Sequence, residues 1–161
     1  MEERGALDAL LFDVAGRLAG SGVAVCGAVQ QNLEGADIAK CHMDLHLLPS
    51  GDVRRISQSL GPLARGCRLD PAALESAVGQ VEAALDSAQV LIVNKFGKQE
   101  AAGGGFRPVI ASALAQGIPV LCGISGGARA DFAAFADGLA QTCRPDVEDI
   151  LDWVHRQISR V

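Results

Sequence analysis

Short blocks of apolar residues alternate along this chain with segments in which apolar residues recur every three or four positions. The blocks are typical of strands that are buried on both faces, and the second pattern is typical of amphipathic helices. Because the two kinds of segment alternate, we expect a mainly parallel sheet with helices on both faces, which is a three-layer α/β fold. The predicted strands are 23–29, 89–93 and 118–124, and the predicted helices are 5–20, 70–85, 106–116, 131–139 and 146–159.

Residues 41–60 follow a different pattern, in which apolar and polar residues alternate as in a strand with one buried face. Residues 49–52 predict a turn, and residues 53–60 are expected to return as the antiparallel partner strand. We therefore predict an antiparallel hairpin inserted into a single domain that spans residues 1–161. The apolar residues of the first strand are Met43, Leu45 and Leu47, and the polar ones are His42, Asp44 and His46.

Composition narrows the possible functions. The 161 residues carry a formal net charge of −5, and aromatic residues make up only 4% of them, which argues against nucleic-acid binding. An apolar run long enough to span a membrane is missing, and so is a secretory leader, so we expect neither a membrane anchor nor export. The five cysteines stand singly, which disfavours a zinc site and predicts reduced thiols in the cytoplasm.

The stretch that follows the predicted strand 89–93 is the strongest candidate for a functional loop. Open α/β sheets bind ligands where their strands end, and this stretch lies at the carboxyl end of a buried strand. It is also rich in charge and in glycine, more than a simple connection requires. Its polar residues include Asn94, Lys95, Lys98, Glu100 and Arg107, and three of its glycines are Gly103, Gly104 and Gly105.

Three segments of the chain resemble the DUF2478 family, bacterial proteins of unknown function. They are residues 44–58, 66–71 and 94–100, and the resemblance extends over nearly the whole chain. That family is in turn similar to the small nucleoside-triphosphatases of the THEP1 type, a branch of the P-loop NTPases. The resemblance therefore implies a fold of the P-loop NTPase type.

The catalytic pattern of those enzymes is not carried over. In the alignment that the resemblance implies, Asn94 falls on an Asp and Lys95 on a Glu, whereas Gly97 and Glu100 match. The phosphate-binding motif Gly-x-x-x-x-Gly-Lys-Ser/Thr is absent from these residues, as is the first strand that would precede it. Lys95 would repel the Mg²⁺ that these enzymes use. We therefore expect a protein that does not hydrolyse nucleotides; the alternative is an unconventional hydrolase that uses Glu100 and Lys95.

Replacing two acids by an amide and a cation predicts an anion site. Lys95 and Lys98 supply positive charge, and the glycines 103–105 can expose backbone N–H groups at the start of a helix. The expected ligand is an oxyanion or a nucleotide phosphate. Molybdate is a candidate that the resemblance implies, because members of the family are associated with molybdenum transport. The predicted ligand-binding residues are Asn94, Lys95, Gly97, Lys98, Glu100, Gly103, Gly105, Arg107, Arg68, Gln30 and Gln58, and Arg129 lies in the loop after the next strand.

Plainer interpretations stay open. Lys95 and Lys98 are equally compatible with solvated loop charges, one of them paired with Glu100. The alternating His42, Asp44 and His46 fit the solvent-exposed face of a hairpin better than a metal site. A third possibility is a protein-interaction module, in which a homodimer covers an incomplete edge of the sheet.

Overall fold

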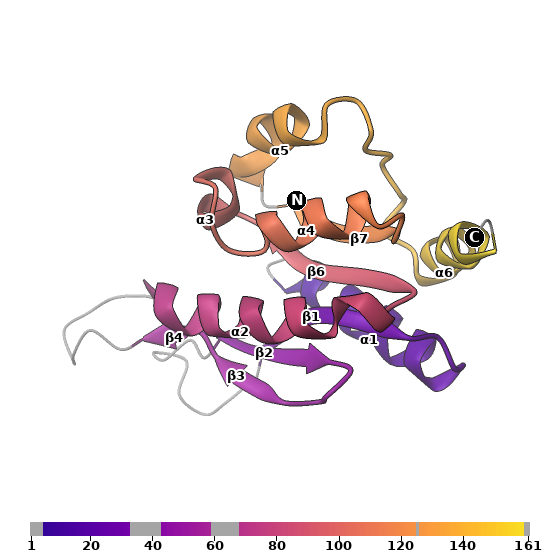
Figure 1. Ribbon diagram of the computed structural model, residues 1–161, viewed down its shortest axis with the longest axis horizontal. Helices are drawn as coiled ribbons and strands as arrows, with labels where there is room; N and C mark the ends of the chain where they lie inside the picture. The colour runs from indigo at the N-terminus through magenta and orange to yellow at the C-terminus, as the bar shows by residue number, and fades with distance from the viewer. Residues whose placement is uncertain (1–4, 33–42, 59–67, 125, 160–161) are drawn as a thin grey trace.

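The computed structural model describes residues 5–32, 43–58, 68–124 and 126–159 (Figure 1). Its centre is a five-stranded sheet with the strand order β3-β2-β1-β6-β7. Strands β1, β6 and β7 are parallel, whereas β2 is antiparallel to both of its neighbours, β1 and β3. The sheet is therefore mixed, with the predicted hairpin at one edge. Its strands are β1 (Val25–Asn32), β2 (Met43–Leu48), β3 (Val53–Arg55), β6 (Val90–Phe96) and β7 (Val120–Ile124).

Helices cover both faces of this sheet, as predicted. One apolar core lies between the sheet and helices α2 and α4, and a second lies between the sheet and helices α1 and α6. The helices are α1 (Ala6–Gly20), α2 (Pro71–Ala84), α3 (Lys98–Ala101), α4 (Arg107–Ala115), α5 (Arg129–Ala136) and α6 (Val147–Ile158), with the 3-10 turns η1 (Leu85–Ser87) and η2 (Gly126–Ala128).

Local sequence signals explain where α2 begins and which face it buries. The Asp70 carboxylate accepts hydrogen bonds from the N–H groups of Ala72 and Ala73, and Pro71 occupies the first helical position. This arrangement satisfies N–H groups that have no partner inside the helix. The predicted helix 70–85 buries one apolar stripe along α2 and the first residue of η1: Leu74, Val78, Val81 and Leu85.

Three strand ends differ from the prediction. β6 continues to Phe96 instead of ending at residue 93, and β1 continues to Asn32. The return strand of the hairpin ends at Arg55, and the chain then enters β4 (Ser57–Gln58), which pairs with β5 (Arg68–Leu69) in a separate two-stranded sheet. All three differences depend on pairing with other strands, which the periodicity along the chain does not reveal.

Asp44 and His46 are not exposed on the hairpin, contrary to the expectation. Asp44 is buried and forms an ion pair with Arg55, with Oδ1 2.9 Å from Nε. The His46 ring packs edge-on against Phe12 of α1, with 5.1 Å between the ring centroids. Among the residues that the structure describes, no cluster of three metal-ligating side chains occurs, and His42 lies outside them.

Gly27 of β1 lies directly against the backbone of Ile92 in β6. Its φ is +140°, and a Cβ at this position would overlap the carbonyl oxygen of its neighbour Ile92. We expect Gly27→Ala to lower the free energy of unfolding by about 2–4 kcal/mol, because strain and overpacking add. Gly79→Ala is the control: this glycine lies inside α2 with open space around it, so alanine should stabilise by about 0.5–1 kcal/mol. Urea denaturation measures both, and equal stabilities for the two variants would contradict this assignment.

Candidate functional site

The candidate loop begins inside strand β6, where the pairing with β7 is irregular. The register between the two strands shifts between Val93 and Phe96, which is the signature of a β-bulge. Asn94 and Phe96 are buried on either side of this irregularity, whereas Lys95 between them is exposed. Bulges of this kind re-aim side chains and are frequent beside functional sites. Successive side chains of a strand point to opposite faces, so the buried Asn94 amide is followed by the exposed Lys95 cation at this strand end.

Asn94 links three elements. Its Oδ1 accepts a hydrogen bond from the backbone N–H of Gln30 in β1 at 3.0 Å, and its Nδ2 donates to Asp8 Oδ1 in α1 at 2.8 Å. An amide can do both because it carries one acceptor and one donor group, whereas a carboxylate only accepts. Asn94 therefore joins β6, β1 and α1 at the carboxyl end of the sheet.

Glu100 closes the turn between β6 and α4. Its side chain is only 4% exposed; Oε1 accepts from the Gly97 N–H at 2.9 Å and Oε2 from the Phe106 N–H at 3.0 Å. The interpretation that Glu100 pairs with a lysine is thus wrong, because backbone N–H groups occupy both of its oxygens. A Cβ at Gly105 would overlap Oε2, so the glycine at this position makes room for the carboxylate.

The backbone N–H groups of the glycine run have acceptors within the protein. The Gly105 N–H donates to Glu75 Oε1 of α2 at 2.8 Å, the Gly103 N–H to the Glu100 carbonyl, and the Gly104 N–H to the Gln99 carbonyl. The expectation that these groups are free for an external anion is therefore wrong. Glu75 and Glu100 supply the negative charge at the start of α4, a position that favours anions.

Arg107 is the first residue of α4, and its half-buried side chain contacts the preceding turn. Its Nη1 donates to the carbonyl oxygens of Glu100 and Ala101 at 3.3 and 3.5 Å. Its guanidinium also lies 4.8 Å from the ring centroid of Phe135 in α5, within the range of a cation–π contact. Arg107 thus ties α3 to α5.

Lys95 and Lys98 form the cationic surface of the loop. Both side chains are exposed, and neither forms an ion pair or hydrogen bond with the part of the chain that the structure describes. They lie on β6 and on the first residue of α3, where β6 ends (Figure 1). These two side chains are therefore available to a ligand, unlike Glu100 and the glycine amides.

The other predicted residues are only partly brought to this loop. Gln30 joins it through the Asn94 contact, whereas Gln58 and Arg68 lie opposite each other in the β4–β5 pair, and Arg129 is exposed at the start of α5. Sequence reasoning missed Asp8 and Glu75, which lie on helices far from the loop in sequence and carry no motif. The sequence marks Asp8 only as an acidic residue in the first turn of α1.

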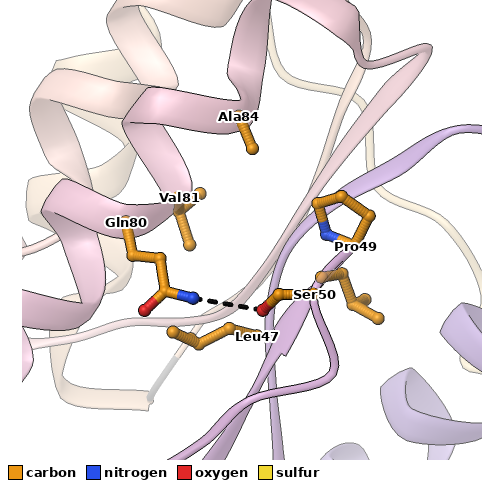
Figure 2. Close-up of a pocket in the computed structure, with 7 residues that line it drawn as sticks. Leu47, Pro49, Ser50, Gln80, Val81 and Ala84 are labelled. Atoms are coloured by element: carbon orange, nitrogen blue, oxygen red, sulfur yellow. Dashed lines mark hydrogen bonds between the residues drawn. The ribbon is translucent and has the colours of Figure 1, made fainter.

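A small pocket lies at the opposite end of the sheet and contains none of the predicted site residues. It measures about 200 Å³, which is below the range of about 300–1,000 Å³ that is usual for ligand pockets. The Gln80 side chain crosses its rim and donates to Ser50 Oγ at 3.1 Å (Figure 2). Its walls come from the hairpin turn and α2: Leu47, Leu48, Pro49, Ser50, Gln80, Val81 and Ala84.

Fold and site together define an α/β protein with a five-stranded sheet flanked by helices and a cationic loop at the end of a parallel strand. The chain belongs to the family described as "Protein of unknown function (DUF2478)", whose model matches residues 1–153. It is 34% identical over 156 residues to the molybdenum import ATP-binding protein ModC 2 of Bradyrhizobium diazoefficiens. That match covers 96% of this chain but only 17% of ModC 2.

The similarity to an ATP-binding protein supports the relation to P-loop NTPases that the sequence motifs imply. No solved structure matches the chain. None of the helices in the described part of the chain is long and apolar enough to cross a membrane.

The Asn94–Asp8 contact makes a testable charge prediction. Asn94→Asp places two carboxylates against each other and should lower the free energy of unfolding at pH 7 by about 1–3 kcal/mol. Adding Asp8→Asn to that variant restores one donor and one acceptor, so the double variant should recover most of the loss. Urea denaturation of both variants measures this recovery. An equal loss in the single and the double variant would show that the pair is not coupled.

Two cysteine thiols are expected to react slowly, because their surroundings raise the pKa of each. Burial raises the pKa of Cys26 to about 11, and it raises the pKa of Cys122 to about 12, with a further contribution from the Glu100 carboxylate. Because the thiolate is the reactive form, alkylation of both thiols by iodoacetamide at pH 8 should be far slower in the folded protein than in urea. Peptide mass mapping measures this difference, and equal rates in the two states would contradict the prediction.

The same shifts predict how stability depends on pH. The folded thiols hold their protons above the ordinary value of 9.0, so the folded state binds more protons than the unfolded state between about pH 9 and 11. The contribution of these thiols to stability is therefore complete below pH 9 and is lost as the pH rises through that window. Serine at both positions should reduce this alkaline loss in urea titrations.

Proposed function

We propose that this chain is a non-hydrolysing binding or regulatory protein on a P-loop NTPase-like domain, and that its ligand is an oxyanion such as molybdate or the phosphate of a nucleotide. The observation that carries the proposal is that Lys95 is exposed at the carboxyl end of β6, close in sequence to the exposed Lys98. Two cations without a counter-ion among the described residues attract an anion. We also expect the protein to act in the cytoplasm and to form a homodimer.

The internal contacts narrow the set of ligand-binding residues. Asn94, Glu100 and the N–H of Gly105 already have partners, so we assign them to holding the loop rather than to contacting the ligand. Lys95 and Lys98 are then the direct contacts. Arg107 contributes positive charge from a fixed position, because its guanidinium is held by carbonyl oxygens and Phe135.

The similarity to ModC 2 supports a connection with molybdenum import. The chain spans 17% of the length of ModC 2, and it lacks the phosphate-binding motif that ATP hydrolysis requires. We therefore infer that this chain does not itself hydrolyse ATP and that it has a role beside a transport ATPase. Sensing the transported oxyanion is the simplest such role.

An unconventional hydrolase is supported less well. Glu100 would be its general base, but both carboxylate oxygens accept backbone hydrogen bonds, and the residue is buried. A general base must reach the proton that it removes. Using Glu100 in this way would require the turn between β6 and α4 to open.

Thermal denaturation with added anions tests the proposal. Molybdate, tungstate, sulfate, phosphate and nucleotides are each added with and without Mg²⁺. A ligand present at a hundredfold excess over its Kd stabilises the folded state by about 2.7 kcal/mol, which raises the Tm. We expect an oxyanion or a nucleotide to raise the Tm without Mg²⁺, and Lys95→Ala to abolish the increase.

Arg156→Ala is the matched control, because it removes one exposed positive charge from α6, away from the loop. It should leave the anion effect unchanged. If Lys95→Ala and Arg156→Ala weaken the effect equally, the anion acts through the overall charge of the protein. If no anion raises the Tm, the proposed function is wrong.

A further inference from the structure

Strand β7 ends the sheet, and the outer side of β7 lacks a partner strand among the described residues. The Leu91 N–H donates to the Pro119 carbonyl at 3.0 Å. This bond shows which residues of β7 direct their backbone groups toward β6 and which direct them away. Leu121 and Gly123 then point their backbone groups toward β6, and Val120, Cys122 and Ile124 point theirs away. Apart from hydrogen bonds of the β6–β7 ladder, the backbone groups of these three residues form none with the described part of the chain.

The two edges of the sheet differ in how they are protected. Exposed edge strands usually carry charges or are very short, which prevents pairing with another chain. At the opposite edge, β3 has only three residues, two of which are Arg54 and Arg55. β7 instead reads Val-Leu-Cys-Gly-Ile and carries no charge, and its outward residues are half-buried. β7 thus has the composition of an interior strand.

Exposed apolar side chains lie on a helix of each face that packs near β7. Leu7 of α1 is 37% exposed and lies next to β7, since a Cβ at Gly123 would come within 2.9 Å of its Cδ2. Leu114 is 47% exposed on α4, which packs against β7 from the other face.

We propose that the outer edge of β7 is the interface between two copies of this chain. The strands pair antiparallel about a two-fold axis at Cys122, so that Cys122 faces its own counterpart and Val120 of one copy lies opposite Ile124 of the other. A two-fold interface requires a surface that complements itself, and a short uncharged strand with apolar residues at both ends meets this condition. This inference specifies the surface of the expected homodimer and does not depend on the anion site.

A charge exchange across the axis tests this geometry. Val120→Lys with Ile124→Lys places two lysines opposite each other at both ends of the pair, which is unfavourable for cross-strand neighbours. We expect the wild type to have twice the 16.6 kDa chain mass by light scattering and the double lysine variant to be a monomer. Val120→Glu with Ile124→Lys places opposite charges together and should restore the dimer. Val53→Lys, on the exposed strand at the other edge, is the control and should remain a dimer.

Hydrogen exchange of the unmodified protein gives an independent measurement. The outward amides of Val120, Cys122 and Ile124 should be protected at high concentration and should exchange at least about tenfold faster on dilution below the dimer Kd. A wild type that is monomeric at micromolar concentration would overturn the proposal. A double lysine variant that remains folded and dimeric, or rapid exchange of these amides in the dimer, would also overturn it. None of these outcomes bears on anion binding by Lys95, which the thermal measurements address.

Discussion

The buried carboxylate of Glu100 fixes the connection between β6 and α4, and the geometry of the candidate site depends on it. One oxygen holds the N–H of Gly97 and the other holds the N–H of Phe106, so both ends of the turn are tied to a single side chain. Leaving either buried N–H without an acceptor would cost about 1–3 kcal/mol. The close approach of Oε2 to Gly105 explains that glycine by packing. With the turn held internally, Lys95 and Lys98 are left at the surface.

The parts of the fold that depend on local chemistry could be predicted from the sequence. The cap at Asp70 and the proline after it are neighbours of the helix that they start, and the stripe of α2 follows from the period of the helix. The buried strand β6 and the hairpin turn are also short-range features. In each case, the residues that decide the structure lie within a few positions of one another.

The contacts that shape the site could not be predicted in this way. Asn94 and its partner Asp8 are 86 residues apart, and Gly105 and Glu75 are 30 residues apart. The sequence shows a glycine run before a helix but does not show that two carboxylates of the protein already serve its amides. The sequence pattern also predicts too early an end for β6. The irregular pairing between Val93 and Phe96 depends on β7, which lies far along the chain.

These contacts give different meanings to the two departures from the P-loop pattern. At position 94, a carboxylate would face the carboxylate of Asp8 and could not donate to it, so the amide is explained by the structure alone. The negative charge at this end of the sheet has not disappeared, since Asp8 carries it from α1. At position 95, no contact with the described residues requires a lysine. The proposed anion site therefore depends on Lys95, the exposed cation at this strand end that has no internal role among the described residues.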